Sequence, residues 1–422
     1  MKTRNLVLAL LVLLSVITFL DRLAIAAAGP RMQQELGLDP KQWGWILGAF
    51  VLAYGVFEIP TGAMGDRMGQ RRVITRIVVW WSVFTALTGA VSGFVPLLAT
   101  RFLFGAGEAG AYPNMAASVA RWFPRMERAR AQGFVWGGSR AGGALAPLLV
   151  VPLQARFGWR ASFWILGVIG VAWASVWWWW YRDLPAQSGR VSEEELAEIG
   201  SSSNAETHEA APWGRLLRSR QLWLILGMYS SYAWSSWFYF SWLHTYLVRG
   251  RGFSYDQMAV ISALAFAFGA AANLAGGYVG DLAVRKLGVK RGRRMIGCAS
   301  LSAGAVLLLA TALTRDQVSA TVLISLGLGV TDLMLPSAWA TCVDIGGRYT
   351  GTVTGAMNSA GQLGGFLCTV LFGYIVALSG SYDLPLVVIA AMLTLSAVLF
   401  SRIDSSRPLF EEAEATANGG RD

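Results

Sequence analysis

Apolar stretches of about 20 residues, separated by short polar and basic segments, follow one another along the whole chain. A helix needs about 20 consecutive apolar residues to cross the hydrocarbon core of a bilayer. By that measure the pattern predicts twelve membrane-spanning helices. They are expected near residues 5–28, 43–63, 73–92, 95–118, 131–153, 160–181, 221–247, 257–280, 294–313, 317–342, 350–379 and 381–402.

A polar segment divides these predicted helices into two sets of six. Residues 183–220 are rich in Ser, Glu and Ala, a composition typical of a solvated linker. We therefore expect an all-α membrane protein in which twelve transmembrane helices form two pseudo-symmetric six-helix bundles. The predicted organisation is a first bundle at 1–182, a cytoplasmic linker with one short amphipathic helix at 183–220, a second bundle at 221–403 and a cytoplasmic tail at 404–422.

Two glycine-containing patterns occur once in each predicted bundle. GAMGDRMGQRR at 62–72 corresponds to GGYVGDLAVRKLG at 276–288, with the same spacing from Gly to Asp. GFVWGGSRAGGALAP at 133–147 corresponds to GAMNSAGQLGGFLCT at 355–369, with the paired glycines at the same offset. Such correspondence is typical of transporters built from repeats, in which the substrate site lies near the bilayer midplane between the repeats.

Composition and charge support a membrane protein and limit its partners. With 55% hydrophobic residues, 14% charged residues and a mean hydropathy of +0.47, the chain is too apolar for a soluble domain. The net charge of +10 comes mainly from loops on the side of the two termini, which the positive-inside rule places in the cytoplasm. Nucleic-acid binding is therefore not needed to explain it. Cys298, Cys342 and Cys368 lack metal-ligand spacing and no P-loop motif occurs, so we expect no metal and no cofactor.

Six segments carry a resemblance to a known family. They are FLDR at 19–22, EIPTGAMGDRMGQRR at 58–72, RFLFGAGEAGAYPN at 101–114, RWFPRMERARAQGF at 121–134, SWLHTYLVRGRGFS at 241–254 and GAMNSAGQLGG at 355–365. The chain resembles the major facilitator superfamily, and within it the anion:cation symporter branch. That branch includes bacterial sugar-acid:proton symporters, the vesicular glutamate transporters and sialin. The loop at 62–72 specifies only the superfamily, whereas the combination of 19–22 with 101–114 specifies the branch.

Charged residues inside the predicted spans are the first candidates for a functional site. Asp21 and Arg22 interrupt the first apolar stretch, and a charge there costs roughly 2.5–3.5 kcal/mol on insertion scales. Arg101 and Glu108 are seven residues apart, hence about 10 Å along one face of the fourth helix. We expect all four to face the bundle interior as one cluster of two acids and two arginines. The alternative is a pair of buried salt bridges that only join the two helices.

The residue types suggest separate roles in binding an anion and carrying a proton. Arg22 offers a planar fork of donors that matches a carboxylate, whereas Asp21 and Glu108 can be neutralised by protonation. We predict that Asp21 carries the coupled proton while exchanging Arg101 as a partner, and that Glu108 is a second protonatable group. The resemblance implies the same distribution and favours Tyr54, Trp339 and Asn358. The predicted substrate-binding residues are Arg22, Tyr54, Arg101, Ser139, Arg140, Tyr232, Trp339 and Asn358.

Four polar residues in the spans have roles that the sequence leaves open. Arg140 either binds a second carboxylate or offsets Glu108, and Asp332 either neutralises Arg140 or is another proton site. Glu58 and His244 stand where the branch usually has Gln and Pro. We expect Glu58 near the cytoplasmic mouth and His244 near the outer one.

A second set of charges is expected to act at the cytoplasmic face. Asp66 is predicted to pair with nearby helix ends and with Arg67, Arg71 and Arg130, holding the two halves closed on that side. This is a gating role, and each such pair near water contributes modestly.

These features predict a proton-coupled symporter that imports a small organic anion by alternating access. The expected substrate is a sugar acid, namely an aldonate, aldarate or hexuronate. The alternatives are a transporter of another carboxylate, aromatic or dicarboxylic, and a membrane enzyme or sensor, which would require a catalytic dyad or a signalling domain. We expect a monomer in the bacterial inner membrane, with both termini cytoplasmic, and only protons, the anion and lipid as partners.

Overall fold

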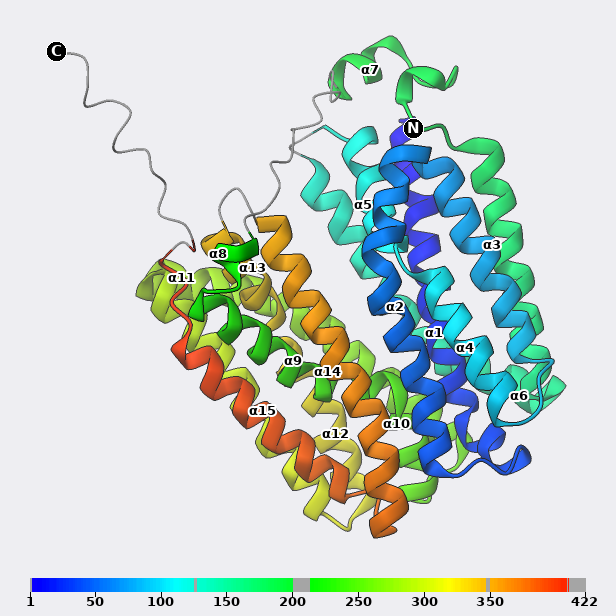
Figure 1. The fold of residues 1–422 in the computed structure, drawn as a ribbon, viewed down its shortest axis with the longest axis vertical. Helices are drawn as coiled ribbons and strands as arrows, with labels where there is room; N and C mark the ends of the chain where they lie inside the picture. Colours follow the sequence, from blue (N-terminus) through cyan, green and yellow to red (C-terminus); the bar gives the residue numbers. More distant parts are fainter. Residues whose placement is uncertain (1, 125–126, 200–212, 347–349, 408, 410–422) are drawn as a thin grey trace.

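The computed structural model describes residues 2–124, 127–199, 213–346, 350–407 and 409, and all regular structure in these ranges is helical. Figure 1 shows the arrangement of the helices. They are α1 (Thr3–Glu35), α2 (Pro40–Met68), α3 (Gln70–Thr88), α4 (Phe94–Glu108), α5 (Ala111–Trp122), α6 (Arg128–Trp180), η2 (Pro185–Gln187), α7 (Glu193–Ile199), α8 (Trp213–Leu216), α9 (Arg220–Ser241), α10 (Leu243–Thr245), η3 (Tyr246–Gly250), α11 (Tyr255–Leu313), α12 (Gln317–Asp332), α13 (Leu335–Gly346), α14 (Thr350–Ser379) and α15 (Leu384–Arg402). Six helices in the described part are long and apolar enough to cross a membrane.

The two longest helices are each divided by a glycine. Helix α6 has 53 residues and α11 has 59, which at 1.5 Å per residue is far longer than a bilayer core of about 30 Å. Gly158 in α6 (φ 79°, ψ 160°) and Gly288 in α11 (φ 78°, ψ 164°) have non-helical backbone angles. Only glycine adopts such angles without strain, so each long helix is two helices that meet at a glycine.

Two other predicted spans are broken near their middle. The span predicted at 95–118 consists of α4, which ends at Glu108, and α5, with Gly110 at φ 83° between them. Asn114 Nδ2 donates to the Gly110 carbonyl oxygen at 2.8 Å, which also accepts from the Asn114 backbone N–H at the start of α5. The span predicted at 317–342 likewise consists of α12, which ends at Asp332, and α13. Each break therefore follows directly after an acidic residue.

The helices form two groups that pack mainly within themselves. Helices α1 to α6 pack against one another, as do α9 to α15, and the groups meet along α2–α14, α6–α11 and α1–α10 (Figure 1). Hydrogen bonds join the two groups at the C-terminal end of α1. Gln33 Nε2 donates to Thr245 Oγ1 at 3.3 Å, and Arg249 Nη2 donates to the Pro30 carbonyl oxygen at 3.0 Å. We call these bonds the distal contacts.

Part of the predicted linker is a helix that holds the start of α1. The carboxylate of Glu195 in α7 accepts hydrogen bonds from the backbone N–H groups of Thr3 at 3.0 Å and Arg4 at 2.8 Å. Free N–H groups at a helix start need such acceptors. Lys2 and Arg4 also form ion pairs with Glu198, and the hydrogen bond from Lys2 lowers the pKa of Glu198. Where one short helix is expected between residues 183 and 220, the described residues contain α7, α8 and the short η2.

The residues after α15 are anchored to the second group of helices. Lys290 Nζ donates to Asp404 Oδ2 at 2.6 Å, and Ser406 donates to the same carboxylate through its hydroxyl and its backbone N–H. The hydrogen bond from Lys290 and those from Ser406 lower the pKa of Asp404 to about 2. The predicted tail thus begins with a packed turn, and residues 410–422 lie outside the described part.

Candidate functional site

Arg22 and Glu108 form a buried ion pair between α1 and α4. Arg22 Nε donates to Glu108 Oε1, and the Glu108 side chain is 0% exposed. The pair does not use all of its polar atoms, because the buried Nη2 of Arg22 and Oε2 of Glu108 have no hydrogen-bond partner. Half of the guanidinium fork is therefore free to bind a further anionic group.

Aromatic rings surround the Arg22 guanidinium. Its central carbon lies 4.6 Å from the ring centroid of Tyr54, 5.4 Å from that of Phe19 and 5.5 Å from that of Phe50. The faces of such rings attract a cation and exclude water from it. Tyr54, which the resemblance favours, therefore lies at the predicted anion-binding arginine.

Asp21 and Arg101 are buried in the same region without a direct ion pair. They are 1% and 2% exposed. Neither carboxylate oxygen of Asp21 accepts a hydrogen bond, and no ion pair within 4.0 Å includes Asp21 or Arg101 in the described part of the chain. Arg101 instead lies over the rings of Phe104, at 4.1 Å, and Phe50, at 5.2 Å. The structure pairs Glu108 with Arg22 and leaves the expected Asp21–Arg101 pair unformed.

Tyr112 connects the first ion pair with α6. Its hydroxyl lies 2.7 Å from Ser139 Oγ and 3.1 Å from Ser15 Oγ, and its ring lies 5.8 Å from the Arg22 guanidinium. The ring stacks on Trp136 with the centroids 4.7 Å apart and the planes 6° apart. Sequence reasoning predicted Ser139 but not Tyr112. The only signal for Tyr112 was its place in the motif at 101–114.

A second buried ion pair joins the two groups of helices. Arg140 Nη2 from α6 lies 3.3 Å from Asp332 Oδ2 from α12, and Tyr232 in α9 donates its hydroxyl to Asp332 Oδ1 at 2.8 Å. Of the two alternatives for Asp332, the ion pair with Arg140 is formed in this structure, and a role as a proton site stays a prediction. Glu108 is not the partner of Arg140, since it pairs with Arg22. Trp339 in α13 lies near this pair, with its ring 6.5 Å from that of Trp136.

The remaining polar residues of the spans have different surroundings. Asn358 Nδ2 in α14 donates to both carboxylate oxygens of Glu58 in α2, at 3.2 and 3.4 Å. This contact is a further polar link between the two groups of helices, besides the distal contacts and the Arg140–Asp332 pair. His244 is fully buried, and neither ring nitrogen has a hydrogen-bond partner in the described structure, so it does not line an open mouth as expected.

The predicted gating residues are only partly described. Arg71 donates through Nε and Nη2 to the Trp178 carbonyl oxygen at 2.8 and 2.5 Å, and its backbone N–H donates to Asp183. These bonds tie α3 to the end of α6 within one group of helices. Arg67 is exposed, whereas the side chains of Asp66 and Arg130 lie outside the described part. Gating by these residues remains a prediction.

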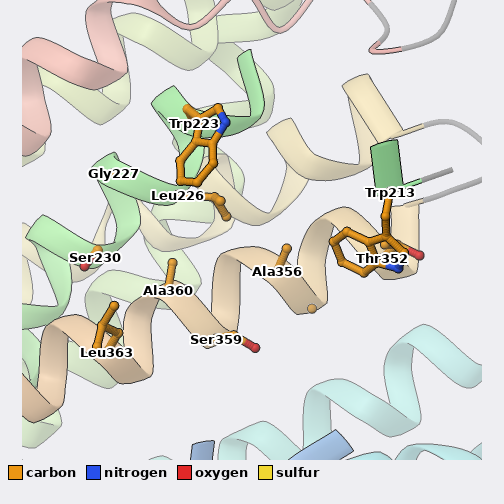
Figure 2. Close-up of a pocket in the computed structure, with 11 residues that line it drawn as sticks. Trp213, Trp223, Leu226, Gly227, Ser230, Thr352, Ala356, Ser359, Ala360 and Leu363 are labelled. Atoms are coloured by element: carbon orange, nitrogen blue, oxygen red, sulfur yellow. The ribbon is translucent and has the colours of Figure 1, made fainter. Parts of the chain in front are cut away.

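A cavity of about 800 Å³ lies between α9 and α14, beside α8 (Figure 2). Trp223 and Leu226 of α9 and Ala356 and Ala360 of α14 line it, and its walls are largely apolar. None of the predicted anion-binding residues is among its lining residues. Because an apolar wall does not compensate a buried charge, the two ion pairs remain the candidate site for an anion.

Two observations define the class of this protein. Its long apolar helices enclose paired charges, and its sequence matches a known family. The family model described as Major Facilitator Superfamily matches residues 11–369. The chain belongs to the major facilitator superfamily and is a multi-pass integral membrane transporter, not an enzyme.

Individual proteins to which the chain is similar are transporters of organic anions. The chain is 33% identical over 401 residues to the "Probable sulfoacetate transporter" of Cupriavidus necator, which covers 94% of this chain and 93% of that protein. It is 28% identical over 415 residues to the hexuronate transporter of Bacillus subtilis, covering 97% of each. Over 394 residues it is 28% identical to the "Probable L-galactonate transporter" of Escherichia coli, covering 93% of this chain and 87% of that protein. The predicted resemblance to sugar-acid and anion transporters is confirmed.

A solved structure shows the shared fold. The bacterial homologue of the human lysosomal transporter Spinster, in an inward-facing and unoccupied conformation, superposes with a TM-score of 0.79 at 19% identity. The superposition covers 97% of this chain and 99% of that one.

Proposed function

We propose that this protein is a proton-coupled symporter that imports a small organic anion, and that Arg22 binds its carboxylate. The observation that carries this proposal is the buried Arg22 guanidinium with one free nitrogen, enclosed by aromatic rings and balanced by Glu108. Relatives named for sulfoacetate, hexuronate and galactonate support an anionic substrate, with sugar acids as the leading class.

Charge balance supports a role for Asp21 in proton coupling. A carboxylate buried without any partner is so costly that the group takes a proton instead. With Asp21 protonated, the two arginines and Glu108 leave a net charge of +1 in this cluster, which suits a monoanion. Release of the proton would restore neutrality and expel the anion. Glu108 is the second candidate for a proton, because its buried Oε2 has no hydrogen-bond partner.

The proposed architecture is two bundles of six spans that rock about the site. Gly158 in α6 and Gly288 in α11 lie between predicted spans, which supports counting each long helix as two. With α4 and α5 taken as one broken span, and α12 and α13 as another, the helices are consistent with the twelve predicted spans and with the units proposed at 1–182, 183–220 and 221–403. The basic loops place both termini in the cytoplasm, and the inner membrane of a bacterium is the proposed location. The distal contacts then close the outer side, so the structure is assigned to an inward-facing state. No cofactor is required, because the proton gradient supplies the energy.

Uptake by the purified protein in proteoliposomes tests the proposal. Labelled galactonate, glucuronate and sulfoacetate would be offered with the outside one pH unit more acidic than the inside. We expect accumulation of at least one of these anions, and a decrease of about 100-fold in its uptake in Arg22→Gln, since charged hydrogen bonds contribute about 1.5–3 kcal/mol each. Arg31→Gln, on the same helix but outside the site, is the matched control and should transport normally. Normal uptake in Arg22→Gln would exclude the anion clamp, and accumulation after the gradient is collapsed would exclude proton coupling.

A further inference from the structure

The Arg140–Asp332 pair, which joins the two groups of helices, resembles the Arg22–Glu108 pair within the first group. Glu108 is the last residue of α4 and Asp332 is the last residue of α12, so each acid stands immediately before a helix break. Each acid is almost fully buried, with side chains 0% and 1% exposed, and each faces an arginine from another helix. The negative end of a helix dipole adjoins each carboxylate, which favours a cationic partner or a proton there.

The second pair is also incompletely bonded. Asp332 Oδ2 lies 3.3 Å from Arg140 Nη2 but accepts no hydrogen bond, while Oδ1 accepts only the bond from Tyr232. A pair selected only for stability would use these buried atoms, because unsatisfied polar atoms are costly. Asp332 Oδ2 can therefore accept a proton or a further hydrogen bond.

Both arginines border the same aromatic group. The Tyr112 ring lies 5.8 Å from the Arg22 guanidinium, and its hydroxyl bonds to Ser139, the residue before Arg140. Trp136, which stacks on Tyr112, lies one helical turn before Arg140 and hence on the same face of α6. The two ion pairs therefore flank a single aromatic surface.

We propose that Arg140 and Asp332 form a second unit for one anionic group and one proton, so that the protein takes a dianion and carries two protons with it. This inference rests on the proposed function of Arg22. The first anionic group of the substrate binds Arg22, and the second displaces Asp332 from the Arg140 guanidinium. The proton is taken up on Asp332 Oδ2, because the displaced carboxylate would otherwise be a buried, unpaired charge.

The surroundings of Asp332 are consistent with this exchange. The titratable groups that the described elements turn toward it are Arg140 from α6 and Tyr229, Tyr232 and Tyr239 from α9. Tyr239 donates its hydroxyl to the Ile324 carbonyl oxygen at 2.7 Å, and Gly269 of α11 lies beside the Asp332 carboxylate. Arg140 is therefore the one cation in the described structure that pairs with Asp332, and its loss to the substrate leaves a proton as the remaining means of neutralisation.

The chemistry of the substrate follows from this arrangement. The two ends of the molecule are anionic, and the middle lies against the Tyr112–Trp136 stack. A dicarboxylate sugar acid and a sulfonated carboxylic acid both meet this description. A dianion that enters with two protons moves no net charge, so its uptake is independent of the membrane potential.

Galactarate and galactonate test the inference, since they share a six-carbon chain and differ in having two carboxylates or one. Uptake would be followed in proteoliposomes containing the full chain, with a pH difference of about one unit and the membrane potential clamped at zero. Two coupled protons give about 100-fold accumulation of galactarate, and one coupled proton gives about 10-fold accumulation of galactonate. In the variant that combines Arg140→Gln with Asp332→Asn, galactarate accumulation should fall to about 10-fold. The preference for galactarate over galactonate should be lost as well.

Arg293→Gln combined with Asp344→Asn removes another ion pair, at 3.2 Å between α11 and α13, and is the matched control. It should leave the galactarate accumulation unchanged. Equal accumulation of galactarate and galactonate by the wild-type protein would overturn the inference even if the Arg140 and Asp332 variant does not fold. So would an unchanged galactarate accumulation in that variant. If the wild-type protein transports neither galactarate nor galactonate but accumulates glucuronate or sulfoacetate, the inference fails and the proposed function stands. If it transports none of these anions, or transports them independently of Arg22, the proposed function fails instead.

Discussion

Replacing Arg22 and Glu108 singly and together tests whether they form one electrostatic unit. In Arg22→Gln the Glu108 carboxylate, at 0% exposure, has no cation within ion-pair distance. Removing one partner of a buried pair typically costs about 3–5 kcal/mol. Arg22 has a side chain 17% exposed and several aromatic rings around it, so Glu108→Gln should be the milder change. We therefore expect Arg22→Gln to be the less stable of the two single variants.

The variant that combines Arg22→Gln with Glu108→Gln shows whether the two side chains stabilise the protein as an ion pair or through independent packing. Two neutral glutamines of similar volume leave no unpaired charge, so we expect the double variant to recover at least about 2 kcal/mol relative to the sum of the single changes. Thermal unfolding of the purified proteins in one detergent would rank the four midpoints. A double variant whose destabilisation equals that sum would refute the reasoning, because independent contributions would mean that the pair is not coupled.

Three further predictions concern the scaffold and use the same unfolding assay. Gly158→Ala should lower the free energy of unfolding by about 1 kcal/mol, since an alanine at φ 79° is strained, and should leave uptake unchanged. An unaltered unfolding midpoint would show that position 158 does not require a residue that tolerates positive φ. Glu195→Gln should lower the free energy of unfolding by about 1 kcal/mol, because a neutral amide accepts the Thr3 backbone N–H more weakly than the carboxylate does. Glu193→Gln, which keeps that hydrogen bond, is the control. Because the pKa of Asp404 is lowered to about 2, its contribution is present above about pH 4 and lost as the pH falls toward 2. The difference between wild type and Asp404→Asn should therefore shrink across that interval, and a constant difference would contradict the bond from Lys290.

The sequence predicts the helical class and the main charged residues because both follow from the cost of polar groups in lipid. Asp21, Arg22 and Glu108 are conspicuous in apolar stretches, and their burial in the interior follows from that cost. Which acid pairs with which arginine depends on helix rotation and rotamers, which hydropathy does not contain. For this reason the sequence does not show that Asp21 and Arg101 are unpaired in this structure, whereas the Arg140–Asp332 pair was among the alternatives that the sequence left open.

The helix breaks and the role of Tyr112 could not be predicted from the hydropathy pattern. The break after Glu108 depends on the left-handed Gly110 and on a side-chain bond from Asn114, and neither interrupts the apolar run. Glycine is frequent in this chain, with 48 residues, so a single glycine does not indicate a break. Tyr112 is recognised only from its contacts with Ser15 and Ser139, which come from two other helices.

The distal contacts have a consequence for the speed of transport. If the proposed alternating access holds, separating the two groups of helices at this end requires Arg249 to leave the Pro30 carbonyl oxygen and Gln33, and Gln33 to leave Thr245, within one cycle. Hydrogen bonds from a charged group are worth about 1.5–3 kcal/mol each, and they are broken before water or a new partner replaces them. We therefore expect a large activation enthalpy for turnover, so that uptake slows steeply on cooling, and a shallower temperature dependence in Arg249→Gln.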